Sequence, residues 1–157
     1  MRRSEAAVAL ICREQRGAIL WLARWNDKWN SLHFVAGHKR PEESFRECVV
    51  REIGEELGLR EADDYTLANG PPRHVEYSAW SASAQADTHY TMELFDGELN
   101  PEAQARVTVD PKNRWLSEDE IECQCTSDGR PVSATMKRLL AEVRGNLRAR
   151  PCPTSTG

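Results

Sequence analysis

Three glutamates are crowded into the stretch "REIGEELGL" at residues 51–59. Glu52, Glu55 and Glu56 are three or four residues apart, so on a helix of about 100° per residue their carboxylates share one arc of the surface. Hard oxygen ligands gathered at one point suit Mg²⁺ or Mn²⁺. A charged helix face that is turned to solvent is the alternative that these residues alone leave open.

The residues upstream extend this stretch into a longer pattern. Five residues separate Gly37 from Glu43, and seven separate Glu43 from Arg51. Together they follow G-x5-E-x7-R-E-U-x-E-E-x-G-U, where U is apolar, and every specified position is filled: Gly37, Glu43, Arg51, Glu52, Ile53, Glu55, Glu56, Gly58 and Leu59. With this motif the chain resembles the Nudix (MutT-like) hydrolase family.

The resemblance implies a metal site. Glu52, Glu55 and Glu56 would hold one or more Mg²⁺ or Mn²⁺ ions, with the main-chain carbonyl of Ala36 as a further ligand. Glu43 and Arg51 would brace the loop and helix, Gly37 and Gly58 would complete the structural motif, and Glu52, Glu55 and Arg51 would act in catalysis.

An acidic residue that activates water is also implied by the resemblance. In some members it is the glutamate at the position of Glu52, and in others it comes from a later part of the chain. Asp110 and Glu93 are the later candidates here, with Glu98 competing, and each of them could equally be an ordinary surface carboxylate.

Two positions depart from the usual family pattern. Many members have Pro-Gly-Gly before the helix, whereas this chain has Val35, Ala36 and Gly37. A carbonyl ligand needs no particular side chain, so Ala36 is compatible with metal binding. Gly54 lies inside the expected helix and should cost about 1 kcal/mol relative to alanine.

The expected reaction is hydrolysis of the pyrophosphate bond in a nucleoside di- or triphosphate derivative, a nucleoside diphosphate linked to a group X. A metal would neutralise the phosphate oxygens and lower the pKa of the attacking water. A Nudix-fold sensor that binds a nucleotide without turnover is the alternative, and isomerase chemistry on an isoprenoid diphosphate is a more distant one. Trp29 and His38 are weak candidates for substrate contact, by stacking or by binding phosphate.

The bulk properties fit a small enzyme. The chain has 157 residues, which favours one domain over 1–150 with a disordered tail over 151–157. A net charge of −4 gives no reason to expect nucleic acid as a partner, and no apolar run is long enough for a membrane span. The five irregularly spaced cysteines favour thiols in a reducing cytoplasm. The resemblance is compatible with a homodimer.

The elements that must position these residues form a single mixed α/β (α+β) domain, and the resemblance makes it an α/β/α sandwich with a mixed β-sheet. Apolar runs at 6–11 and 18–25 predict a hairpin, 31–38 a further extended segment, and 74–81 with 89–95 a second hairpin. Ser44 and Glu47 have capping-box spacing, followed by apolar residues every fourth position to Leu57. Shorter extended pieces are expected at 65–69, 105–109 and 113–116, and a last helix at about 133–147.

Overall fold

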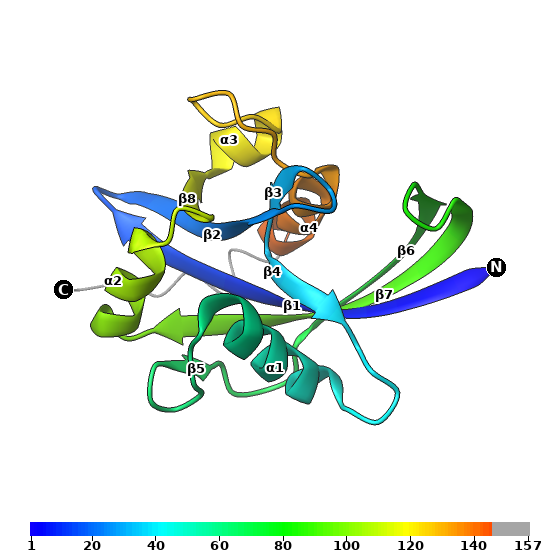
Figure 1. The fold of residues 1–157 in the computed structure, drawn as a ribbon, viewed down its shortest axis with the longest axis horizontal. Coiled ribbons are helices and arrows are strands. Elements are labelled where there is room, and N and C mark those ends of the chain that lie inside the picture. The colour runs from blue at the N-terminus through cyan, green and yellow to red at the C-terminus, as the bar shows by residue number, and fades with distance from the viewer. Residues whose placement is uncertain (146–157) are drawn as a thin grey trace.

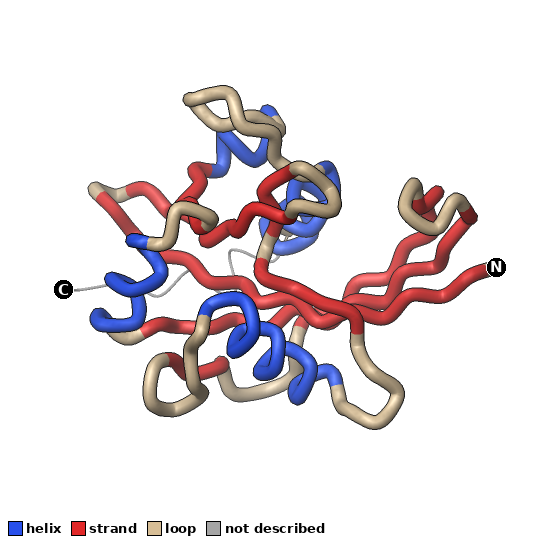
Figure 2. The backbone as a smooth tube through the Cα atoms, in the orientation of Figure 1, coloured by secondary structure: helices blue, strands red, loops and turns tan. Residues whose placement is uncertain are grey.

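The computed structural model describes residues 1–145, which form eight strands and four helices. In chain order these are β1 (Arg2–Gln15), β2 (Ala18–Asn26), β3 (Ser31–His33), β4 (Val35–His38), α1 (Phe45–Leu57), β5 (Tyr65–Leu67), β6 (Arg73–Ser81), β7 (Ala86–Leu99), α2 (Pro101–Val109), β8 (Asn113–Ser117), α3 (Glu118–Cys123) and α4 (Ala134–Arg144). Figure 1 shows their arrangement, and Figure 2 separates helices, strands and loops along the same trace.

The sheet is mixed and is organised around β1. Along one side β1 pairs in parallel with β7, and along the other it pairs antiparallel with β4 and then with β2. β5 and β6 add to β7, while β3 and β8 add to β2. The single parallel pair brings residues 2–11 beside 88–97, so distant parts of the chain meet at the centre of the sheet.

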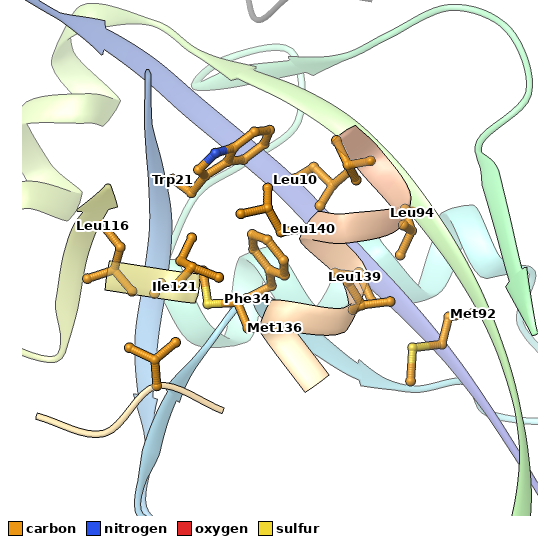
Figure 3. Packing of buried hydrophobic residues seen from close by; sticks show 14 of the residues in the cluster. Leu10, Trp21, Phe34, Met92, Leu94, Leu116, Ile121, Met136, Leu139 and Leu140 are labelled. Atoms are coloured by element: carbon orange, nitrogen blue, oxygen red, sulfur yellow. The ribbon is translucent and has the colours of Figure 1, made fainter. Parts of the chain in front are cut away.

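Helices cover both faces of β1. Its alternating residues divide between two buried clusters: Val8 and Leu10 face the cluster that contains α4, whereas Ala7 and Ile11 face the cluster that contains α1. Figure 1 shows α1 on one side of β1 and β7, with α3 and α4 on the other. Figure 3 shows residues of the α4 helix packed among strand residues. The predicted α/β/α sandwich with a mixed sheet is confirmed.

The helix α1 begins and ends as predicted. The Ser44 hydroxyl accepts from the Glu47 main-chain N–H at 3.0 Å, and the Glu47 carboxylate accepts in return from the Ser44 N–H at 2.9 Å. Gly58 ends the helix in the left-handed conformation, with φ of +68°, which favours glycine. Val49 and Ile53 of the expected apolar stripe are buried against the sheet.

Both predicted hairpins are confirmed. β1 and β2 pair antiparallel between Cys12–Gln15 and Ala18–Trp21, and β6 and β7 pair over 73–81 and 86–94. The segment at 31–38 is extended as expected, although it divides into β3 and β4.

The prediction of an extended piece at 105–109 is wrong, because this segment belongs to α2. The Asn100 side chain caps the helix by accepting from the Ala103 N–H at 2.8 Å, and Pro101 occupies its first turn. Ala103 and Val107, one turn apart, are both buried. Val109, at the end of the helix, is 80% exposed.

The sequence analysis expected two helices, and the described residues contain two more, α2 and α3. α3 begins with a second capping box, in which Ser117 and Glu120 exchange main-chain and side-chain bonds. The last helix is confirmed as α4, with the expected stripe of Met136, Leu139, Leu140 and Val143 buried. The expected end of that helix at Leu147 and the predicted tail at 151–157 lie outside the described residues.

Cys48, Cys123 and Cys125 are free thiols, in line with the expectation for the cysteines, whereas Cys12 is disulfide-bonded and departs from it. No helix among residues 1–145 is long and apolar enough to cross a bilayer. The domain boundary at residue 150 stays a prediction.

Candidate active site

The close approach of α1 to β4 depends on a missing side chain at Gly37. A Cβ atom built on Gly37 would overlap the Glu52 carboxyl group, which lies directly against the strand. On the other side of this loop, the Cys48 thiol lies 3.5 Å from the Gly37 carbonyl oxygen. The motif glycine is therefore required by packing between the loop and the helix.

Arg51 joins the loop to the helix through a set of charge-assisted hydrogen bonds. Its guanidinium donates two bonds to Glu43, at 2.7 and 3.0 Å, and others to Glu52 at 2.8 Å and Glu55 at 3.3 Å. It also donates to the His38 carbonyl at 3.1 Å. These bonds lower the pKa of Glu43 to about 2, with Arg51 as the largest cause, and raise the pKa of Arg51. The arginine fixes two motif carboxylates relative to the loop.

Glu52 and Glu56 are the two motif carboxylates whose pKa is raised by burial. Burial is the largest cause that raises the pKa of Glu52, and it raises the pKa of Glu56 to about 7. The charge of Glu52 adds to the rise at Glu56, whereas Arg24 and a hydrogen bond from the Ala36 main chain act against it. Two neighbouring, poorly solvated carboxylates favour a cation beside them.

The donor set fits a hard divalent cation. Glu52, Glu55 and Glu56 offer carboxylate oxygens, and Ala36 borders the same place through its main chain. As their side chains are placed in residues 1–145, no three acidic, histidine or cysteine groups converge on one point. Glu52 and Glu55 do not converge with Glu56 because both accept hydrogen bonds from Arg51, which hold them in their present positions.

A cavity of about 690 Å³ opens beside this group. Ala36, Gly37 and Glu56 line it at the metal-ligand end. Its floor is made by β1, β7 and β6, and its walls by the segment from β2 to β3 and by the first turns of α4. The volume and the mixture of aromatic and charged lining residues suit a ligand of nucleotide size.

Arg24 is a site residue that the sequence analysis missed. It lines the cavity, its side chain is 19% exposed, and it donates to Asp110 at 3.0 Å and to Asn113 at 2.9 Å. The sequence around Arg24 does not mark it as a site residue, because its hydrogen-bond partners lie in or next to β8, about 90 positions later in the chain. Only the pairing of β2 with β8 brings them together.

The three later acidic candidates lie in different places. Asp110 is bound to Arg24 and does not line the cavity itself. Glu93 lies in the same row of the sheet as Gly37, because Ala7 pairs with both, and its carboxylate bonds to His74 at 2.7 Å. Glu98 is exposed at the far end of β7, opposite Thr66. Of these, Glu93 is on the row that carries the motif glycine.

Both weak substrate candidates line the cavity. Trp29 is 44% exposed and its ring meets the His33 ring edge-on at 5.3 Å between centroids. His38 bonds through Nδ1 to the Ser4 hydroxyl at 3.3 Å. His33, which the sequence analysis did not single out, is buried and bonds to Ser133 at the start of α4 at 2.9 Å.

Comparison with known proteins agrees with this geometry. The family model described as "NUDIX domain" matches residues 1–139. No curated protein sequence matches the chain. The fold is similar to that of an Ap4A hydrolase from C. elegans, with a TM-score of 0.64 and 20% identity over 94% of this chain and 99% of that one.

Two bacterial structures are also similar. A Nudix hydrolase from M. smegmatis, RenU, has a TM-score of 0.61 and 19% identity over 97% of this chain and 91% of that one. A mutT/nudix family protein from Listeria innocua has a TM-score of 0.66 and 15% identity over 95% and 96%. With the motif complete, the cavity beside it and the family model matched over 139 residues, the chain belongs to the NUDIX domain family and is a Nudix pyrophosphohydrolase.

Proposed function

We propose that the protein hydrolyses the pyrophosphate bond of a nucleoside di- or triphosphate derivative, with Mg²⁺ or Mn²⁺ held by Glu52, Glu55, Glu56 and the Ala36 carbonyl. One observation carries the proposal: Glu56 and the motif loop line the same nucleotide-sized cavity as the exposed ring of Trp29. The bound metal would neutralise phosphate oxygens and lower the pKa of the attacking water.

The protein's own groups set up the rest of the reaction. Arg51 keeps Glu52 and Glu55 at fixed positions beside the loop, so little reorganisation is needed when substrate binds. Arg24, held by Asp110 and Asn113, presents a cation next to Glu56 at the point where phosphate would enter. Trp29 offers an aromatic face for a base. Glu52 and Glu93 are the two candidates for accepting the proton from water.

The similarity of the fold to that of the C. elegans Ap4A hydrolase supports dinucleoside polyphosphates as one substrate class to test. A cytoplasmic location and a homodimer stay predictions, as does the absence of a nucleic-acid partner. The intact set Glu52, Glu55 and Glu56 argues against the sensor alternative, because a protein that only binds has no need of all three carboxylates.

The test is phosphate and pyrophosphate release with Mg²⁺ over a substrate panel. The panel holds nucleoside triphosphates, 8-oxo-dGTP, ADP-ribose, dinucleoside polyphosphates and sugar nucleotides. We expect turnover of one class, its loss in EDTA, and its return with Mg²⁺ or Mn²⁺. Glu56→Gln keeps the shape of the side chain and removes its charge, so we expect kcat to fall by about 100-fold or more.

Glu42→Gln is the matched control, because Glu42 is an exposed glutamate near the same helix, at a position that the motif leaves unspecified. We expect it to leave kcat within about twofold. Tight nucleotide binding with no turnover of any substrate would replace the hydrolase with the sensor alternative. Turnover that is unaffected by both EDTA and Glu56→Gln would refute the metal site.

A further inference from the structure

The cavity extends well beyond the motif. Its floor is a series of rows across the sheet, in which each row joins paired residues on β1, β7 and β6. Val8, opposite Ala36, marks the metal-ligand end; Ser4, in a row with Tyr90 and Tyr77, lies four residues along β1. At about 3.3 Å per residue, this row is about 13 Å from Val8.

The last row of the floor is farther still. Arg2 is in a row with Thr88 and Ala79, and it donates to the Thr88 hydroxyl at 3.2 Å. Arg2 and Ala79 both line the cavity. Six residues of β1 separate this row from Val8, which corresponds to about 20 Å. A substrate whose pyrophosphate lies at Glu56 would have to extend along the floor to reach it.

An arginine from α4 overhangs the row of tyrosines. The Arg138 guanidinium lies 3.8 Å from the centroid of the Tyr77 ring, and Tyr77 packs on Tyr90 with 5.1 Å between centroids. Tyr77 also forms a side-chain hydrogen bond with Thr135, which lies on α4 like Arg138. Stacking on an aromatic ring restricts an arginine while its N–H groups stay available at the edge.

The arginines at the far end of the cavity, away from the motif, form no ion pairs with carboxylates of residues 1–145. The cavity is lined by the cations Arg2, Arg24, Lys28 and Arg138, and by the acids Asp27 and Glu56. Asp27 pairs with Lys112, and Arg24 pairs with Asp110. Within residues 1–145, Arg2 and Arg138 have no carboxylate partner. In a protein of net charge −4, two unpaired arginines in one part of one cavity favour an anionic ligand there.

We propose that the far end of the cavity, formed by Arg2, Arg138 and the Tyr77–Tyr90 pair, binds a phosphate monoester that the substrate carries away from its scissile pyrophosphate. A phosphate monoester is close to a dianion at neutral pH, which matches two cations, and its oxygens fit the planar donor edge of arginine. The inference rests on the proposed function, since it places the pyrophosphate at Glu56, and it makes Arg2 and Arg138 specificity residues.

The first test measures binding without cleavage. Calorimetric titration in EDTA, where no divalent cation is available for cleavage, compares NADH with NADPH and dephospho-coenzyme A with coenzyme A, pairs that differ by one phosphate monoester. We expect at least one phosphorylated member to bind about 10-fold to 100-fold more tightly than its partner, as one charge-assisted contact allows. In Arg138→Met and Arg2→Met the preference should fall below about threefold.

Two further variants distinguish a site that binds an anion from a surface on which a nucleotide base stacks. Arg138→Lys keeps the charge, so an anion site should retain most of the preference, whereas a stacking surface for a base would be lost. Arg130→Met is the matched control, because Arg130 also lies over an aromatic ring, Trp25, but does not line the cavity. It should leave the preference unchanged. Equal losses for both members of each pair in Arg138→Lys would overturn the proposal.

The second test uses hydrolysis of matched pyrophosphate substrates that differ by one phosphate monoester, NADPH against NADH and coenzyme A against dephospho-coenzyme A. We expect at least one phosphorylated member to have the higher kcat/KM, by about tenfold, through a lower KM that Arg138→Met reverses. Turnover of the panel with no preference in either test would refute the anion site and leave the hydrolase intact. A binding preference with no turnover of any substrate would support the anion site and refute the hydrolase.

Discussion

At the scale of single residues, the site is defined by how closely the Gly37 loop approaches Glu52. The carboxylate lies where a side chain at position 37 would be, and Arg51 then holds it by a 2.8 Å hydrogen bond. The motif therefore specifies a space as well as a set of charges. A side chain at position 37 would displace this motif carboxylate.

We predict that Gly37→Ala lowers kcat by about 100-fold. The added methyl group forces Glu52 away from the loop, and displacements of about 1 Å in an active site cost this much. The measurement is steady-state hydrolysis with Mg²⁺, together with urea unfolding to show that the protein is folded. Full activity in this variant would show that Glu52 works from another position.

Gly54→Ala is the matched glycine substitution within the same motif. A Cβ there meets only the Leu59 carbonyl, at 3.7 Å, and the residue lies in the interior of α1. We predict that the free energy of unfolding rises by about 1 kcal/mol, because alanine loses less backbone entropy in a helix, and that kcat stays within about twofold. Urea unfolding and the same hydrolysis assay measure both. A decrease in stability would contradict the prediction.

The residues of the site differ in how far sequence could reveal them. The motif residues are close along the chain, and the resemblance that they carry implied that Glu43 and Arg51 would brace the loop and helix; the hydrogen bonds between the two agree. Arg24 and Arg138 have cavity neighbours that come from distant strands and helices. No local pattern marks such residues, since their surroundings are set by strand pairing and by the docking of α4.

At the scale of elements, capping residues explain both the correct and the incorrect expectations. α1 was predicted from Ser44 and Glu47, and the same spacing at Ser117 and Glu120 begins α3. α2 was not predicted, although the residues before it, Asn100 and Pro101, are typical of a helix start. Local capping, together with burial of Ala103 and Val107, decided the structure of this segment.

We predict that Asn100→Ala lowers the free energy of unfolding by about 1 kcal/mol. The Asn100 side chain accepts from the Ala103 N–H at 2.8 Å and also donates to the Asp63 carbonyl at 2.7 Å, so alanine leaves both groups without this partner. Urea unfolding gives the value. Gln104→Ala, on the same helix, should change stability by no more than about 0.5 kcal/mol, because the Gln104 side-chain amide makes no hydrogen bond within residues 1–145.

Equal stabilities of Asn100→Ala and the wild-type protein would mean that the start of α2 is held by packing of the helix against β7 and β8 and needs no cap. The activity assay should be unaffected in either case, because no residue of α2 lines the cavity.

At the scale of the whole molecule, the cavity is a product of topology. Its lining comes from β1, β2, β4, β6, β7, α1 and α4, which the parallel pairing of β1 with β7 and the docking of α4 bring together. The sequence predicted most of these elements and could not predict which of their faces would enclose one space. His33 shows the consequence, since it is buried where β3, Trp29 and α4 meet.

We predict that His33 contributes stability that is lost as the pH falls below about 7. Burial lowers its pKa from 6.5 to about 4 in the folded state, and no charged group contributes to the shift. Between these values the unfolded chain takes up a proton at His33 that the folded protein does not, so this contribution to the free energy of unfolding decreases with decreasing pH. From pH 7.5 to 5 the expected loss of the His33 contribution is about 2 kcal/mol.

The comparison that isolates this effect is urea unfolding of the wild-type protein and His33→Asn at pH 7.5, 6 and 5. Asparagine can still bond to Ser133 but does not titrate, so the stability of the wild-type protein relative to the variant should fall by about 2 kcal/mol over this range. His74 and Glu56 titrate with the opposite sign, since their pKa values are raised and the stabilisation that their protonated forms give is lost as the pH rises, but both proteins share those contributions. If the substitution prevents folding, the imidazole resonances of the wild-type protein give the pKa directly. Parallel stability curves, or a His33 pKa near 6.5, would show that the imidazole is reached by water through the cavity.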